Sequence, residues 1–335
     1  MIDWVTAVIT CNHDPSKLMS GMVMSFDNRG ENEWTVNKTL TVEGSYSSTI
    51  QIKSHTDTQI WVSGNPTKFL QGHNIFGTDD LSYLMGRFFD ELCKYDELVL
   101  MPTDDQYEAI QDGLYSLKRV DINQSWHLKN RSEVLAWIRA AGTCSRMRHR
   151  GAGQYTGDTL YFGKNSRRWG VKCYSTGQEI NAKNHKLPDE LQIPELIEWA
   201  DKALRIELVM RSMQLKDMML DQGSAWCSET AKVLLCSLVL DNLEISDNMA
   251  LPDSVLDTLP TRLKGIYSLW VNGADLRKSF SKTSFYRYRK QFLEYGIDIA
   301  ILQEKERSNV IPLIRYLEAT PASIPAWAYE KRLVA

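Results

Sequence analysis

The sequence predicts an α+β protein in which a domain built on an antiparallel β-sheet is followed by a helical domain. Within the 335-residue chain, short β-rich stretches separated by polar, glycine-containing turns dominate the first hundred residues. Three later stretches alternate apolar and polar side chains with the period of two expected of strands. Beyond about residue 215, apolar residues recur at helical spacing. We therefore place the two domains at residues 1–215 and 216–335.

Individual elements follow from these patterns. Strands are predicted at residues 34–36, 49–52, 59–62, 116–126, 159–162, 169–174 and 204–211. Helices are predicted at residues 80–94, 132–141 and 193–202, and residues 218–240 are apolar-rich at helical spacing. The strands at 159–162 and 169–174 flank a turn and form a hairpin, and residues 142–157 form a basic, glycine-containing loop.

A helix-turn-helix is predicted near the C-terminus. A helix over residues 275–280 and a short turn precede a second helix over 284–295, with Thr283 as its N-cap and Gly296 at its end. Aromatic residues form one stripe of the second helix, which leaves a basic face of the kind that enters the major groove of DNA. That face carries Tyr286, Arg287 and Lys290.

The composition is that of an ordinary globular protein. Hydrophobic residues make up 43% of the chain and charged residues 24%, which excludes a disordered polymer. The longest nearly apolar run, Val233 to Leu240, is far shorter than the roughly 18 to 20 residues of a membrane-spanning helix. Residues 1–4 lack the features of a signal peptide, and the scattered cysteines fit a reducing compartment. We expect a cytoplasmic protein without membrane contact.

Two basic islands interrupt an otherwise acidic chain. Residues 129–174 have a net charge of +8 and residues 261–290 a net charge of +7, although the whole chain carries −3. Either island alone could be a solvated surface, but two together favour a polyanion such as DNA, because Lys and Arg bind phosphates with release of counterions. The candidate DNA-binding residues are Arg146, Arg148, Arg150, Arg167, Arg168, Arg287 and Lys290.

Three of the predicted strands each present one apolar and one polar face. If these strands are neighbours in one sheet, their polar side chains converge on a single surface. That surface consists of Asp121, Lys172, Tyr174, Arg205 and Glu207. The solvent face of a half-covered antiparallel sheet would show the same alternation without any function.

Several enzyme signatures do not occur in the sequence. Residues 157–165 have one residue too many between their glycines for a phosphate-binding P-loop, and Asn165 replaces its Ser or Thr. His73 has no second histidine two or three residues away, so a two-histidine metal site cannot be built locally. The six cysteines lack the spacing of a zinc site.

Several short segments together resemble the gene II replication initiators of filamentous bacteriophages. They are residues 68–81, Arg119-Val-Asp121, Ser166-Arg-Arg168 before Tyr174, Arg205-Ile-Glu207, Ser284 to Tyr288 before Tyr295-Gly-Ile297, and residues 309–315. These segments occur in the family's order and extend over almost the whole chain. The resemblance implies the antiparallel-sheet fold of rolling-circle initiators. It also implies a site-specific endonuclease that nicks one strand of the replicative form, starts rolling-circle replication and rejoins the displaced strand into a circle.

The resemblance also implies catalytic roles. Tyr174 matches the family's nucleophile, whose covalent attachment to DNA would conserve the phosphodiester energy for rejoining. Relatives carry Lys two residues later, where this chain has Thr176, so either Lys172 takes over in lowering the pKa of Tyr174 or the alignment of this strand is shifted. Tyr161 on the partner strand is the rival nucleophile. Arg205 is expected to neutralise phosphate charge.

A divalent metal is expected to assist, because a phenol near pKa 10 needs a neighbouring cation to favour the phenolate. Asp121 and Glu207, with Glu179 third, are the candidate ligands for Mg²⁺ or Mn²⁺, whose hard character suits carboxylate oxygens. His73 belongs to a possible active-site loop. The expected partners are double-stranded and single-stranded origin DNA and, from the resemblance alone, the host replication helicase and polymerase.

Two other functions stay open at this point. A DNA-binding regulator of phage replication that has lost catalysis would bind without cutting. A metal-dependent nuclease that uses activated water would cut without forming a covalent adduct.

Overall fold

A nine-stranded sheet forms the centre of the computed structural model, which describes residues 1–44, 46–182, 186–245, 259–271, 273–293, 295, 297–300, 317 and 320–334. The strand order is β10-β11-β12-β13-β7-β1-β6-β5-β4, and all neighbours are antiparallel. The strands are β1 (Ile2–Thr10), β4 (Leu40–Glu43), β5 (Thr49–Thr56), β6 (Gln59–Gly64), β7 (Ser116–His127), β10 (Gln154–Thr156), β11 (Thr159–Phe162), β12 (Trp169–Ser175) and β13 (Ala203–Arg211).

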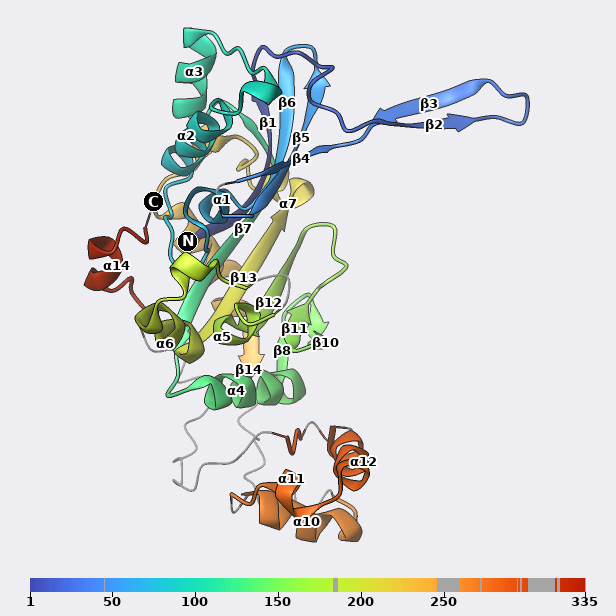
Figure 1. Ribbon diagram of the computed structural model, residues 1–335, viewed down its shortest axis with the longest axis vertical. Helices are drawn as coiled ribbons and strands as arrows, with labels where there is room; N and C mark the ends of the chain where they lie inside the picture. Colours follow the sequence, from blue (N-terminus) through green and yellow to red (C-terminus); the bar gives the residue numbers. More distant parts are fainter. Residues whose placement is uncertain are drawn as a thin grey trace.

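Two smaller sheets accompany the central one. β2 (Met22–Phe26) and β3 (Asn32–Asn37) form a ribbon that extends away from the body in Figure 1. β8 (Ser145–Met147), β9 (Gly151–Ala152) and β14 (Leu243–Ile245) form a three-stranded sheet in the order β14-β8-β9. The prediction of a loop over 142–157 was therefore wrong, because this segment contains three short strands: β8 pairs with β9 and β14, and β10 pairs with β11.

Helices pack around the sheet, and those of residues 261–293 form a group of their own at the bottom of the view in Figure 1. They are α1 (Pro66–Gln71), α2 (Leu81–Leu92), α3 (Asp104–Gln111), α4 (Arg131–Cys144), α5 (Thr176–Glu179), α6 (Pro194–Lys202), α7 (Ser212–Asp217), α8 (Thr230–Leu238), α10 (Thr261–Val271), α11 (Leu276–Ser279), α12 (Lys282–Leu293) and α14 (Ala326–Glu330). Short 3₁₀ turns occur at Asp96–Leu98, Asp189–Leu191, Gly223–Ala225 and Leu240–Asn242. The predicted α+β fold, with an antiparallel sheet followed by a helical region, is confirmed.

The main core lies on the apolar face of the sheet. Val171, Leu208 and Ile122 lie side by side across β12, β13 and β7, and all three are buried. This core also includes Trp226 and Val239, so the chain continues to pack on the sheet beyond residue 215. The boundary at 215 stays a prediction. The helices α10 to α12 enclose a separate core that contains Leu263, Trp270, Phe285 and Phe292.

The turn from β6 into the 73–77 loop is encoded locally. Asn65 is the N-cap of α1, and its side chain accepts the N–H of Lys68 at 2.8 Å. Gly72 ends this helix at a φ of 81°, in the left-handed region that glycine enters without strain. The loop that follows therefore turns back towards the strands of the polar face.

Two predicted helices differ from the structure. Within 218–240, only Thr230–Leu238 is α-helical, because Met219 has a φ of 55° and Gly223 begins a 3₁₀ turn. The second helix of the helix-turn-helix begins at Lys282, and the Ser281 hydroxyl, not that of Thr283, accepts the N–H of Ser284. Gly296 and the segment 309–315 lie outside the described residues.

Candidate active site

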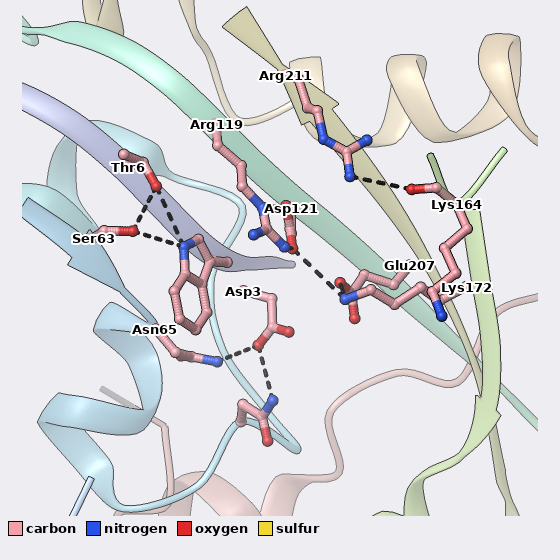
Figure 2. Close-up of polar contacts among 12 residues, drawn as sticks. Asp3, Thr6, Ser63, Asn65, Arg119, Asp121, Lys164, Lys172, Glu207 and Arg211 are labelled. Carbon is pink, nitrogen blue, oxygen red and sulfur yellow. Dashed lines mark hydrogen bonds and ion pairs between the residues drawn. The ribbon is translucent and has the colours of Figure 1, made fainter. Parts of the chain in front are cut away.

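The three strands that carry the predicted polar surface are neighbours in the sheet, in the order β12-β13-β7. Lys172 lies opposite Glu207 and Tyr174 opposite Arg205 in the register of β12 and β13. Asp121 extends from β7 on the same face (Figure 2). The convergence that strand alternation predicted is therefore present.

The polar surface is buried. Asp121 is 1% exposed, Glu207 3% and Arg205 0%, and Tyr174 is only 7% exposed. A solvent face of a half-covered sheet would leave these side chains in water, so that interpretation fails. Charges buried to this extent are costly unless they are paired, and a pairing network is indeed present.

Glu207 lies at the centre of the network. One of its oxygens, Oε2, accepts a hydrogen bond from the Tyr174 hydroxyl at 3.1 Å, and Oε1 accepts one from the Lys172 ammonium. Lys172 Nζ lies 3.9 Å from Asp121 Oδ2, and Arg119 holds Asp121 through Nε at 2.7 Å and Nη2 at 2.5 Å (Figure 2). A phenol, a carboxylate and an ammonium thus stand in direct contact.

The electrostatics give Tyr174 and Glu207 complementary states. Burial raises the pKa of Tyr174 well above its usual value, and the charges of Glu179 and Glu207 add to that effect. Burial also opposes ionisation of Glu207, but the Lys172 ammonium and the hydrogen bonds that Glu207 accepts hold its pKa below the usual value. Tyr174 is therefore a protonated phenol that donates to an ionised carboxylate. Arg205 is the neighbouring cation that lowers the pKa of Tyr174, and a lowering by Lys172 stays a prediction.

Arg205 lies beside Tyr174, its partner in the register of β12 and β13. Its Nη2 donates to the carbonyl oxygen of Ile75 at 3.1 Å, and its charge favours the phenolate of Tyr174. The side chain is fully buried, and its expected contact with substrate phosphate stays a prediction.

Asp3 is a site residue that sequence reasoning missed. It is buried on β1, and its Oδ1 accepts hydrogen bonds from Asn65 Nδ2 at 2.5 Å and Asn74 Nδ2 at 2.9 Å (Figure 2). Burial raises the pKa of Asp3, and the charge of Glu207 raises it further, so the two carboxylates are close enough to interact. The sequence offered one signal for Asp3, which is an aspartate between the apolar residues Ile2 and Trp4 of a β-rich stretch.

His73 is buried in the loop that supports the site. It is 1% exposed, its Nδ1 accepts the N–H of Ile75 at 3.2 Å, and burial lowers its pKa to about 4. The loop around it reaches the site through Asn74 and through the Ile75 carbonyl that Arg205 contacts.

Two cavities meet at the network. The tyrosine cavity, of about 410 Å³, is lined by Asp158, Thr159, Tyr161, Lys172, Tyr174, Ser175, Gln178, Glu179, Ala182 and Glu207. The Trp4 cavity, of about 380 Å³, is lined by Asp3, Trp4, Ser47, Ser48, Thr49, Asn65, Lys68, Asn74, Arg119, Asp121, Lys172, Glu179 and Glu207. Lys172, Glu179 and Glu207 are common to both. Tyr161, the rival nucleophile, shares its cavity with Tyr174.

The donor chemistry suits a hard divalent cation only in part. Four carboxyl groups gather here, and burial, with smaller effects of the Asp3 and Glu207 charges, raises the pKa of Glu179 to about 7. Lys172, however, lies between Asp121 and Glu207, and among the described residues no three His, Cys, Asp or Glu side chains are grouped to hold a metal. Thr176 is buried, and the ammonium beside Tyr174 comes from Lys172.

The predicted DNA-binding residues occupy three surfaces. Arg146 and Arg148 are exposed at β8 and the turn after it, and Arg287 and Lys290 are exposed on α12. Arg167 and Arg168 are exposed in the turn between β11 and β12, where Arg168 pairs with Asp217. Arg150 is largely committed to the protein, because it stacks 3.9 Å from the Trp169 ring centroid and donates to the Trp169 carbonyl at 3.0 Å.

Two known protein families match this chain, one in its N-terminal part and one in its C-terminal part. Residues 1–229 match the N-terminal family of the gene II replication-associated proteins, and residues 259–334 match the C-terminal family of the same proteins. The chain belongs to the gene II replication-associated protein family. It is 40% identical to the gene II replication-associated protein of Enterobacteria phage I2-2, over 97% of this chain and 96% of that protein. It is 24% identical to the protein of the same name from Enterobacteria phage M13, over 80% and 77%.

A solved structure is also similar to this member of the gene II family. The Rolling Circle Replication Initiator Protein from Geobacillus stearothermophilus matches 75% of this chain and 87% of its own, with a TM-score of 0.33 and 11% identity. Within the described residues, no helix has the length and apolar character needed to span a membrane.

Proposed function

We propose that this gene II family member initiates phage replication by nicking and rejoining one strand of origin DNA, with Tyr174 as the nucleophile. The observation that carries the proposal is the hydrogen bond of 3.1 Å from the Tyr174 hydroxyl to Glu207 Oε2 in the wall of a cavity, beside the Lys172 ammonium. A nucleophile in contact with a base, and a base oriented by a third group, is the arrangement of covalent catalysis.

The proposed reaction exchanges one ester for another. The Tyr174 oxygen forms a bond to phosphorus as its proton passes to Glu207, and the bond from phosphorus to the 3′ oxygen breaks. The 3′ oxygen leaves as a hydroxyl with a proton from solvent, while Lys172 offsets charge on the phosphate. Rejoining is the reverse, in which a 3′ hydroxyl attacks the phosphotyrosine. The host polymerase would extend the 3′ hydroxyl, and the host helicase would open the duplex ahead of it.

A requirement for Mg²⁺ or Mn²⁺ is part of the proposal. Asp121 and Glu207, with Glu179 third, are the expected ligands, and the ion would supply charge neutralisation at the phosphate. Because Lys172 lies between Asp121 and Glu207, its ammonium would have to move aside for the ion to bind. Support comes from the excess of carboxylates where the two cavities meet.

A labelled oligonucleotide that spans the phage origin tests the proposal. A single-stranded substrate labelled at its 3′ end is incubated with Mg²⁺, denatured and separated by electrophoresis. We expect a slow-migrating adduct with the wild type and with Tyr161→Phe, and none with Tyr174→Phe. Omission of the metal is expected to reduce the adduct.

Each other outcome assigns a different function. An adduct that survives Tyr174→Phe but disappears in Tyr161→Phe moves the nucleophile to Tyr161. Cleavage without an adduct indicates a nuclease that uses water. Tight binding of the origin without cleavage indicates the non-catalytic regulator.

A further inference from the structure

The indole of Trp4 lines the second cavity and has no role in the chemistry described above. Its Nε1 donates to Ser63 Oγ at 3.1 Å and to Thr6 Oγ1 at 3.4 Å (Figure 2). The guanidinium carbon of Arg119 lies 5.3 Å from the centroid of the ring. The indole is therefore fixed in orientation beside a cation. Fixed aromatic rings next to cations are the surfaces on which proteins stack the bases of single-stranded DNA.

We propose that the Trp4 cavity binds the base of the nucleotide immediately 5′ of the scissile phosphate, stacked on Trp4. This inference rests on the proposed nicking function. In phosphoryl transfer the attacking and leaving oxygens lie roughly in line on opposite sides of the phosphorus. Tyr174 belongs to the tyrosine cavity and Lys172 to the wall that both cavities share. The leaving 3′ oxygen, and the nucleotide that carries it, therefore face the Trp4 cavity.

The size and lining of the cavity agree with this occupant. Its volume of about 380 Å³ lies within the range of small-molecule sites, roughly 300 to 1,000 Å³. Lys68 supplies positive charge for the sugar-phosphate backbone, and Thr49 and Asn74 supply polar groups for the base edge.

The inference implies that the substrate strand is unpaired at the nick. A base inside a duplex is stacked and paired, so it has to leave the helix before it can enter a cavity in the sheet. Trp4 would then recover part of that cost by stacking. It acts as a positioning residue that sets which phosphate lies beside Lys172 and Tyr174.

A cycle of protein and substrate changes tests the proposal. A 5′-labelled oligonucleotide first locates the nick from the length of the released product. Affinity for oligonucleotides is then measured in the Tyr174→Phe background, with and without Trp4→Ala, using an intact strand, a strand abasic on the 5′ side of the nick and a strand abasic on the 3′ side. Trp61→Ala is the matched control, because Trp61 lies on the neighbouring strand β6 with Lys53 Nζ 5.4 Å from its ring centroid, outside the cavity.

We expect Trp4→Ala to weaken binding of the intact strand by roughly 5- to 150-fold, the effect of removing one stacking partner. The 5′ abasic strand should bind both proteins equally, while the 3′ abasic strand should retain the full effect of Trp4→Ala. Trp61→Ala should change affinity less than about twofold. Trp4→Phe, which keeps an aromatic ring, should restore most of the affinity.

Three results would overturn the inference. Equal loss with intact and 5′ abasic strands makes Trp4 a structural residue only. If Trp4→Ala weakens binding of the 5′ abasic strand but not of the 3′ abasic strand, the cavity holds the nucleotide on the 3′ side of the nick. If Trp4→Ala fails to fold, the test uses the Tyr174→Phe protein alone. The inference is then overturned if the 5′ abasic strand binds this protein as tightly as the 3′ abasic strand does. Failure of the wild type to form any adduct contradicts the proposed function itself and is distinct from these results.

Discussion

Among single residues, Glu207 is the one that joins the nucleophile to the cations. It accepts hydrogen bonds from Tyr174 and Lys172 and remains ionised although it is buried. Glu207→Gln keeps an acceptor for the phenol but removes the group that takes its proton. We expect the rate of adduct formation to fall by roughly 10² to 10⁴ with little change in oligonucleotide affinity. Single-turnover assays measure that rate.

The same variant separates the two roles that Glu207 could have. If higher Mg²⁺ fails to restore the rate, Glu207 acts as the base, whereas recovery at high Mg²⁺ makes it chiefly a ligand. Glu43→Gln, which changes an exposed carboxylate on β4, is the control and should leave the rate unchanged. A wild-type rate in Glu207→Gln at ordinary Mg²⁺ would exclude both roles.

His73 provides a test of the loop beneath the site. Burial lowers its pKa to about 4 from the usual 6.5, so the unfolded chain takes up a proton at a pH where the folded protein does not. Stability should therefore fall as the pH drops from about 6.5 to 4, by up to about 3 kcal/mol from this residue. His73→Asn should be less stable at pH 7, and its difference from the wild type should shrink towards pH 4.

Urea unfolding at several pH values measures this effect. His55→Asn, at an exposed position on β5, is the matched control and should follow the wild-type pH dependence. Parallel pH curves for His73→Asn and the wild type would show that His73 is not buried as a neutral ring.

At the scale of elements, the turn that leads into β7 depends on one glycine. Gly113 has a φ of 75°, and an added Cβ would lie 2.5 Å from the Ser224 nitrogen. Gly30 has a similar φ of 82° but nothing within 4 Å of such a Cβ. Gly30→Ala should therefore cost roughly 1–2 kcal/mol from backbone strain alone. Gly113→Ala should cost roughly 1–3 kcal/mol more, because backbone atoms must move.

Urea denaturation of the two variants isolates the steric contribution. Both substitutions alter the unfolded chain in the same way, so the difference between them reports the folded state. Equal losses of unfolding free energy in the two variants would mean that the 3₁₀ turn at Gly223–Ala225 shifts to accept the added Cβ at no free-energy cost.

The alternation of apolar and polar side chains along single strands made most of the polar surface predictable. Asp121, Lys172, Tyr174, Arg205 and Glu207 were grouped from local patterns alone, because side-chain direction in a strand has a period of two. Asp3 was missed because it joins the site only when β1 pairs with β7, whose sequence lies more than a hundred residues away. The Trp4 cavity was equally invisible, since its wall combines residues from both ends of the first 210.

For the whole molecule, the two basic islands lie on different parts of the fold. The first belongs to β8 and the hairpin of β11 and β12, and the second to α10 to α12. Asp298 links the parts, since it accepts both Nε and Nη2 of Arg289 at 2.7 Å and lies 4.0 Å from Arg139 Nη2 of α4. Charge counts predicted both islands, but only the fold distinguishes the exposed Arg146 from Arg150, which packs on Trp169.

The exposed cations permit a test of whether both islands bind DNA at once. The affinity for duplex DNA falls as salt rises, and each phosphate contact adds about 0.9 to the steepness of log affinity against log salt. A substitution that removes one such contact should therefore lower the steepness of this slope by about 0.9. Arg287→Gln with Lys290→Gln should therefore lower the slope by up to about 1.8, and Arg146→Gln with Arg148→Gln should do the same. Lys17→Gln with Lys232→Gln removes two exposed charges outside both islands and should leave the slope unchanged. If only one island lowers the slope and the combined variant equals that one, the DNA binds a single island and the other basic surface is merely solvated.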